Sequence, residues 1–283
     1  MDIKTLLVHL DDGRNAQARV ATAAALAERF DAHLLGVAPT SWILPAVEEA
    51  PFLGMGLTAY QDAAARALRE RAQACVAAFE AQAAARGLTA FEGRVELGDA
   101  ETVLSTAARY ADLTVMTQAH PDEAQTQASA RIAQAVLLQS GRPLLLLPFA
   151  GESAIPTQPR VLAAWNGSRE AARALHDALP LMQDAASVEV VVFETPPDLE
   201  PRYGELPGAD IGLWLARHGL NVKVSHVPVK VAAGEALLSH AADMGAQLIV
   251  AGGWGHSRLR EAVLGGVTRT LMRSSPVPVL LSH

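Results

Sequence analysis

The stretch GAQLIVAGG at residues 245–253 is a short apolar run that ends on two glycines, and PVPVLLSH at residues 276–283 follows about 25 residues later. The same order occurs earlier, where ADLTVMTQ at residues 111–118 precedes GRPLLLLPF at residues 141–149. The two segments align without a gap when the proline of GRPLL is placed on the second proline of PVPVL. Such self-similarity indicates an internal duplication.

The beginnings of the two copies match as well. IKTLLVHL at residues 3–10 and RVLAAW at residues 160–165 are apolar runs that end on Asp11-Asp12-Gly13 and Asn166-Gly167-Ser168. Each is followed by an Ala-rich amphipathic stretch and a second apolar run, the pattern of strand, turn, helix and strand.

These two anchors predict two domains. We expect a first copy at residues 1–149, a linker at residues 150–158 and a second copy at residues 159–283. The linker (AGESAIPTQ) contains small polar residues and proline and lacks apolar periodicity.

The alternation of strands and helices predicts the fold class. Short apolar strands without a period of two are typical of strands buried on both faces, hence of a parallel sheet covered by helices. Each copy is expected to be α/β, an open doubly wound sheet of five parallel strands alternating with four helices. In the second copy this predicts strands at 222–227, 247–251 and 277–281 and helices at 234–244 and 267–274.

The extra length of the first copy lies near Pro39–Asp62 and in the long helix that follows to Gly87. The apolar residues of this segment either cover their own domain or offer a surface for a homodimer: Trp42, Phe52, Leu53 and Met55. The last strand of each copy would be an apolar edge, which proteins normally pair or cover. Pairing within one chain would give an intrachain pseudo-dimer.

Composition excludes several classes of protein. The formal net charge is −7, which disfavours nucleic-acid binding. A single cysteine, Cys75, forms no intrachain disulfide and is expected to be a small core residue. No apolar run is long enough for a membrane span or a signal peptide, so a cytoplasmic location is expected. The phosphate-loop motif G-x-x-x-x-G-K-[ST], a zinc motif and a nucleophile elbow do not occur in the sequence.

The segment AGGWGHSRLREAVLGGVTRT at residues 251–270 could carry chemistry, because it follows a strand and open α/β sheets bind ligands at the carboxyl ends of their strands. The glycines after the strand, at 252, 253 and 255, let a ligand approach the backbone closely. Gly265-Gly266 precede an amphipathic run, and free N–H groups at a helix start attract phosphate. Glycines here are equally explained as turn and cap residues.

The spacing Gly252-x2-Gly255-x9-Gly265 resembles the nucleotide loop of universal stress proteins, and the whole chain resembles a tandem member of that family. The resemblance implies an adenine-nucleotide α-hydrolase-like fold and a stress-response regulator or sensor. It implies a cofactor, ATP or the related ADP or AMP, with or without Mg²⁺, in the second copy. The residues that would bind the nucleotide are Trp165, Asn166, Phe193, Gly252, Gly253, Gly255, His256, Arg258, Gly265, Gly266, Val267 and Thr268.

Two positions depart from the pattern of the family's ATP binders. Gly266 stands where those proteins have Ser or Thr, so a hydroxyl contact to the nucleotide is lost. Two alternatives stay open: the Thr268 hydroxyl replaces this contact, or no residue does. Asn166 stands where they have Asp, and it is either a ligand residue or a turn residue. Trp165 either stacks on adenine or packs in the core, and His256 either contacts phosphate or faces solvent.

The first copy keeps the acidic residue, Asp11, but its loop lacks the glycines. Thr117, His120, Ala130 and Arg131 occupy the positions of Gly252, Gly255, Gly265 and Gly266. Side chains there would obstruct the approach of a phosphate, so we expect residues 1–149 not to bind ATP in the family manner.

A general base is not evident near the loop, where only Glu261 and His256 could serve. We therefore predict no catalytic and no metal-binding residues, and at most a slow ATPase. The alternative is a structural or interaction module that binds an unidentified protein partner without nucleotide.

Overall fold

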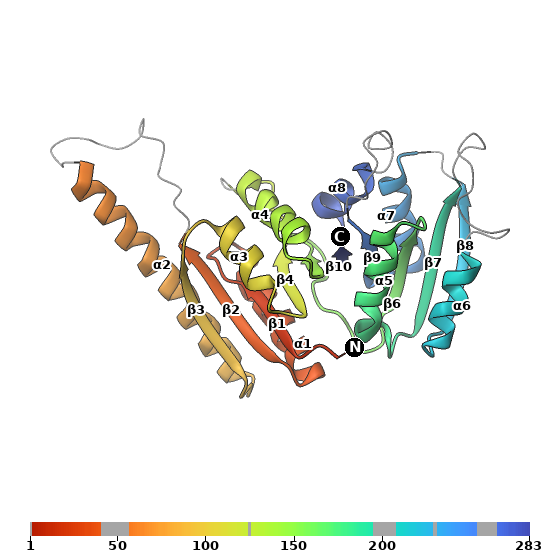
Figure 1. Ribbon diagram of the computed structural model, residues 1–283, viewed down its shortest axis with the longest axis horizontal. Helices are drawn as coiled ribbons and strands as arrows, with labels where there is room; N and C mark the ends of the chain where they lie inside the picture. Colours follow the sequence, from red (N-terminus) through yellow and green to blue (C-terminus); the bar gives the residue numbers. More distant parts are fainter. Residues whose placement is uncertain (1, 41–56, 124–125, 195–207, 229–230, 254–264) are drawn as a thin grey trace. The chain divides into compact units, whose positions relative to one another are not determined.

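The computed structural model describes residues 2–40, 57–123, 126–194, 208–228, 231–253 and 265–283 (Figure 1). Its contacts divide the chain into two compact units, Lys4–Val115 and Met116–His283, the second joined by Met1–Ile3. The last helix and the last strand of the first copy, within residues 116–149, therefore belong to the same compact unit as the second copy.

The unit Lys4–Val115 contains a parallel sheet of strand order β3-β2-β1-β4. Its strands are β1 (Thr5–His9), β2 (His33–Thr40), β3 (Phe91–Leu97) and β4 (Leu113–Thr117). The inner strands are apolar and buried, while β3 alternates half-buried and exposed positions because it lies at the edge of the sheet.

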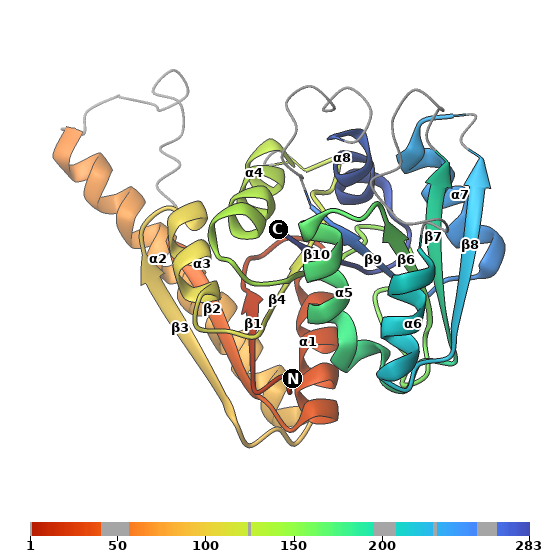
Figure 2. The same cartoon turned by 45° about the vertical axis from the view of Figure 1, so that its right-hand side comes forward.

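Helices cover both faces of this sheet (Figure 2). They are α1 (Ala16–Phe30), α2 (Leu57–Ala85) and α3 (Ala100–Ala108). α1 and α2 contact each other on one face, and α3 packs on the other. The Asp99 side chain accepts a hydrogen bond of 2.9 Å from the Thr102 N–H, which caps the start of α3. Cys75 of α2 is half-buried rather than a core residue, because that face of the helix is partly open.

The second unit contains strands in the order β5-β10-β9-β6-β7-β8. Their bounds are β5 (Leu144–Leu147), β6 (Arg160–Trp165), β7 (Ser187–Glu194), β8 (Val222–Pro228), β9 (Leu248–Gly252) and β10 (Val279–Ser282). The ladders among β6 to β10 are parallel, and β5 pairs with β10 in the antiparallel direction. This confirms the expected pairing of the two apolar last strands within one chain.

Five helices belong to this unit among the residues that the structure describes: α4 (Thr126–Gln139), α5 (Arg169–Met182), α6 (Ala209–Arg217), α7 (Ala233–Met244) and α8 (Gly265–Ser274). The Ser168 hydroxyl accepts a hydrogen bond of 3.2 Å from the Ala171 N–H and caps α5. Gly245 ends α7 in the left-handed conformation, with φ of 63°, as glycine commonly does after a helix.

The duplication is visible element by element. An offset of 135 residues carries β4 onto β9 and β5 onto β10, with equal lengths and ends. The same offset carries the last residue of α4, Gln139, onto the last residue of α8, Ser274. The first copy is longer where expected, because α2 has 29 residues and its counterpart α6 has nine.

The predicted elements of the second copy are confirmed to within two residues at each end. Helix α8 begins at Gly265 instead of residue 267, so the glycine pair forms the first helical residues. The residues Trp42, Phe52, Leu53 and Met55 lie outside the described part of the chain. In the described residues, no helix is both long and apolar enough to span a membrane.

Candidate functional site

The candidate site lies where two adjacent parallel strands of the second copy end. β6 ends at Trp165 and β9 ends at Gly252, and the ladder between them runs in register from Val161 opposite Leu248. Helix α8 begins at Gly265 and leads on to β10 at the same sheet. Gly255, His256 and Arg258 lie outside the described residues.

Gly252 is required by packing against the start of α5. A Cβ atom at this position would lie 2.6 Å from the Ala171 nitrogen and 2.7 Å from the Glu170 carbonyl carbon. Both atoms belong to backbone, which cannot rotate away. The glycine therefore permits the first turn of α5 to sit against the end of β9.

Gly253 is enclosed from three directions. Its N–H donates to the Ser282 carbonyl at 2.8 Å, and its carbonyl accepts from the His283 ring at 3.0 Å. A Cβ atom here would lie 2.8 Å from the Leu137 side chain of α4. Packing and backbone hydrogen bonds thus account for both glycines at the end of β9.

The first turn of α8 contains Gly265, Gly266, Val267 and Thr268. A Cβ atom at Gly266 would meet no atom of the described residues within 4 Å, and the residue is exposed. Thr268 is 2% exposed, so its side chain is enclosed by the protein rather than presented at the helix start. The first turn of α8, where Gly266 is exposed, is the part of the helix suited to an anion, because the N–H groups of a first turn have no acceptor within the helix.

Asn166 forms the turn that connects β6 to α5. Its Oδ1 accepts hydrogen bonds from the Ser168 N–H at 3.1 Å and from the Ser168 hydroxyl at 2.7 Å. Gly167 between them has φ of 64°, which favours glycine. The turn interpretation of Asn166 is confirmed, and the residue is also exposed at the site.

Trp165 and Phe193 are both half-buried, but they do not lie on one face of the sheet. Trp165 is paired with Val192, and Phe193 is the next residue along β7. Successive side chains of a strand point to opposite faces, so Trp165 shares a face with Val192 and Phe193 lies on the other. Gly208 before α6 approaches Val192, which places Trp165 on the α5 and α6 side.

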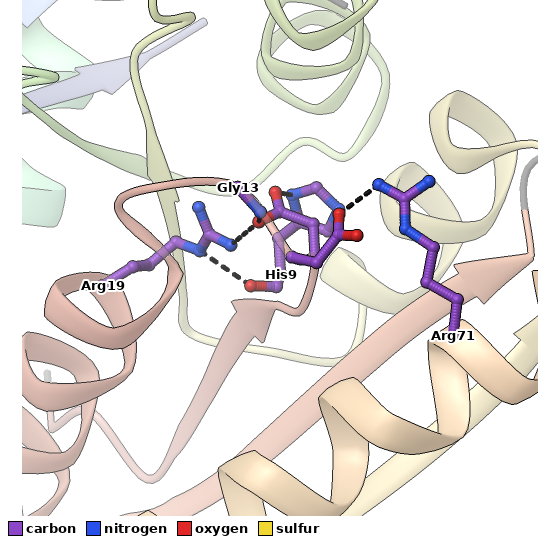
Figure 3. A network of polar contacts seen from close by, with 6 residues as sticks. His9, Gly13, Arg19 and Arg71 are labelled. Atoms are coloured by element: carbon purple, nitrogen blue, oxygen red, sulfur yellow. Dashed lines mark hydrogen bonds and ion pairs between the residues drawn. The ribbon is translucent and has the colours of Figure 1, made fainter. Parts of the chain in front are cut away.

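The turn between β1 and α1 of the first copy, the counterpart of the turn between β6 and α5, contains a network of charged residues (Figure 3). The buried Arg19 of α1 donates to the Asp11 carboxylate at 2.7 Å and to the His9 carbonyl at 2.8 Å. The Gly13 N–H also donates to this carboxylate, at 2.9 Å. From the other side, Arg71 of α2 pairs with Asp12.

Burial and charge shift the pKa values within this network. Burial lowers the pKa of His9 to about 4, with a smaller opposing effect from Asp11. Burial alone would raise the pKa of Asp11, but the Arg19 charge and hydrogen bonds outweigh it, so that pKa falls below its usual range. Asp11 is thus an ionised carboxylate that Arg19 already neutralises.

The positions that replace the loop glycines in the first copy have other contacts. The His120 ring packs edge-on against Phe149, with ring centres 5.3 Å apart, and its Nδ1 accepts from the Asp122 N–H at 3.2 Å. Ala130 and Arg131 lie inside α4, which begins at Thr126, four residues before Ala130. The start of α4 therefore does not correspond in position to the start of α8.

Sequence reasoning did not single out Arg19, Glu170 or Gln118. Arg19 and Glu170 are each only 3% exposed, and Gln118 is 4% exposed. An arginine on the apolar face of an Ala-rich helix was a usable signal for Arg19. For Gln118 the only usable signal was its position in the duplication, because aligning the two copies places it at the counterpart of Gly253. In the described residues, no three His, Cys, Asp or Glu side chains gather as they would around a metal ion.

The comparisons with known proteins agree with this architecture. Residues 159–283 match the model of the Universal stress protein family. A universal stress protein from Archaeoglobus fulgidus superposes with a TM-score of 0.70 at 17% identity, covering 99% of this chain and 96% of the other. No curated protein matches the sequence.

Two structures from Pseudomonas aeruginosa are also similar over 99% of this chain. A putative universal stress protein from strain UCBPP-PA14 has a TM-score of 0.60 at 18% identity and is covered over 93% of its length. A functionally unknown protein from strain PAO1 has a TM-score of 0.59 at 17% identity and is covered over 92%. These likenesses concern the fold.

The sheet order and the duplication define a tandem α/β protein with the adenine-nucleotide α-hydrolase-like fold of the universal stress proteins. Its C-terminal copy, residues 159–283, matches the model of the universal stress protein family. The resemblance inferred from the sequence is confirmed, and it extends as a fold over nearly the whole chain.

Proposed function

We propose that the protein is a stress-response regulator or sensor that binds ATP, or a related adenine nucleotide, in its C-terminal copy. The bound phosphates would lie at the first turn of α8, beside the exposed Gly266. Asn166 and either Trp165 or Phe193 would face the nucleoside part. A cytoplasmic location belongs to this proposal, since cytosolic ATP would supply the ligand.

The observation that supports the proposal most is the exposed position of Gly266 in the first turn of α8. Gly252 and Gly253 are explained by protein packing, whereas a Cβ atom at Gly266 would meet none of the described residues within 4 Å. A helix start with glycines and unpaired N–H groups attracts a phosphate, because the donors and the helix dipole act together. The match of this copy to the universal stress protein family supports a nucleotide as the source of the phosphate.

The proposal assigns the N-terminal copy, residues 1–149, a supporting role without ATP. Its acidic residue Asp11 is paired with the buried Arg19, so it is not available to a ribose hydroxyl in the same way. Its equivalents of the α8 glycines lie within the interior of α4. Residues 150–158 are proposed as the linker between the copies.

A pair of matched variants tests the location of the site. Gly266→Trp should abolish ATP binding in calorimetric titration with Mg²⁺, because the indole would occupy the position proposed for the phosphates. Arg131→Trp, at the equivalent exposed position of the first copy, should leave the affinity unchanged. Equal binding by both variants would place the nucleotide elsewhere or exclude it.

Turnover distinguishes a sensor from a slow ATPase. Under saturating ATP and Mg²⁺, phosphate release should remain far below one turnover per second, the low end of ordinary enzymes. If the wild-type protein, freed of co-purified nucleotide, binds no ATP at millimolar concentration, the loss of the hydroxyl at Gly266 and of the carboxylate at Asn166 is decisive. The protein would then be an interaction module.

A further inference from the structure

Gln118 follows β4 in the first copy and connects it to a helix of the second copy. Its backbone N–H donates to the Leu147 carbonyl at 2.8 Å, which continues the sheet. Its side-chain Nε2 donates to the Leu271 carbonyl in α8 at 2.8 Å, and its Oε1 accepts from the Phe149 N–H at 3.2 Å. The side chain is 4% exposed, so both bonds are shielded from water.

The acceptor lies in the last turn of α8, where helical carbonyls lack full partners. Besides the bond from Gln118, the Leu271 carbonyl accepts a longer bond of 3.3 Å from the Ser275 N–H. Carbonyls in the last turn of a helix have few donors from the helix itself, and Gln118 gives this carbonyl a second, shorter bond. Gln118 therefore caps α8 from the other copy of the repeat.

The counterpart of Gln118 is Gly253, and the two positions show the same backbone pattern. The Gly253 N–H donates to Ser282 just as the Gln118 N–H donates to Leu147. The side chains differ, because Gly253 receives Leu137 of α4 in the space where a Cβ atom would lie. The first copy thus contacts the second at the end of β9 and at the end of α8.

Helix α8 is also fixed along its length. Gly234 in the first turn of α7 leaves room for Thr270 of α8. A Cβ atom added at Gly234 would lie 2.7 Å from the Thr270 Cβ atom. A ten-residue helix is a rod of about 15 Å, so contacts at Thr270 and Leu271, in its second half, restrict where its start can lie. That start contains Gly266.

We propose that Gln118 is a positioning residue for the nucleotide site of the C-terminal copy, acting through α8. The degenerate N-terminal copy would then set the geometry of the active one, which explains a buried amide at a position where the second copy has glycine. This inference rests on the function proposed above.

Gln118→Met tests the role, because methionine has a similar length and makes neither hydrogen bond. We expect ATP affinity to fall roughly tenfold, in proportion to the net value of buried hydrogen bonds. Amide hydrogen exchange of residues 269–273, whose N–H groups bond back to the first turns of α8, should become faster when it is measured without nucleotide. Leu104→Ala is the control, since this fully buried residue lies in the unit Lys4–Val115 and its loss lowers stability without reaching α8.

The outcomes separate the two proposals. Wild-type protein that binds no ATP overturns the proposed function and this inference together. Wild-type binding with unchanged affinity and unchanged exchange in Gln118→Met overturns this inference alone. Weakened binding in Leu104→Ala to the same degree would show an effect of stability, which also overturns it. If Gln118→Met does not fold, Gln118→Leu and Gln118→Glu, measured in the same way, decide the question.

Discussion

Leu145 lies directly opposite Leu280 in the antiparallel ladder of β5 and β10, and the two leucines occupy equivalent positions of the two copies. On either side, Leu144 pairs with Leu281 and Leu146 pairs with Val279. An offset of 135 residues relates Leu145 to its counterpart Leu280. The same offset relates Leu144 to Val279 and Leu146 to Leu281, so the duplication maps each of the two flanking pairs onto the other. The ladder therefore has a local two-fold axis between the two leucines, as an isologous dimer interface has.

A double-mutant cycle at this pair should show coupling. Leu145→Ala and Leu280→Ala each remove a fully buried side chain, and each should lower the free energy of unfolding by about 3 kcal/mol. Because the residues are cross-strand neighbours, the double variant should differ from the sum by at least about 0.5 kcal/mol. Denaturant titrations measure all four proteins, and strict additivity would argue against the pairing.

The glycines of the site should differ in their tolerance of alanine. Gly252→Ala places a Cβ atom against the backbone of α5 and should cost about 3 kcal/mol of stability. Gly266→Ala meets no atom of the described residues within 4 Å and should instead gain about 0.5 kcal/mol, because glycine is a poor helix former. Thermal unfolding compares the two; a similar loss in both would contradict the described packing.

Gly266→Ser should tighten ATP binding. Serine restores the hydroxyl of the family's ATP binders at a position with room for it. A hydrogen bond to a charged phosphate would improve the dissociation constant three- to tenfold. Gly266→Ala is the matched control, since it adds the Cβ atom without the hydroxyl. Equal affinity of the serine and alanine variants would mean that no phosphate lies at this position.

His9 should make stability depend on pH. Its pKa falls from 6.5 to about 4 on folding because burial disfavours the charged ring. The folded state therefore favours neutral His9, and this contribution is present above pH 6.5 and lost as the pH falls toward 4. The loss is about 3 kcal/mol over that range.

The comparison protein for this prediction is His9→Gln, which carries no titrating ring. The free energy of unfolding of the wild type should fall more steeply between pH 6.5 and 4 than that of the variant. Asp11 acts at lower pH, because Arg19 holds its pKa below the usual range. Parallel curves for the two proteins would show that His9 titrates normally in the folded state.

The sequence predicted the fold because its strands are apolar on both faces. LTVMT and LIVAG each read as buried parallel strands, and the structure has both with nearly no exposure. The edge strands were less regular: β3 alternates exposed and half-buried residues, since only one side of it is paired. The antiparallel pairing of β5 with β10 followed from the need to cover two apolar edges.

The candidate site could be predicted only in part. The strand ends and the helix start came from glycine spacing, but spacing does not reveal what each glycine contacts. Gly252 and Gly253 are explained by α5 and by Leu137, which are distant in sequence. The pairing of Arg19 with Asp11 and the bond from Gln118 to Leu271 depend on tertiary packing, which local pattern does not encode.

The proposed function requires that one chain binds one adenine nucleotide, in the C-terminal copy. Native mass spectrometry of nucleotide-free protein, titrated with ATP and Mg²⁺, measures this number directly. We expect a single bound nucleotide per chain at saturation and none in Gly266→Trp. Two nucleotides per chain, or one that persists in Gly266→Trp, would contradict it.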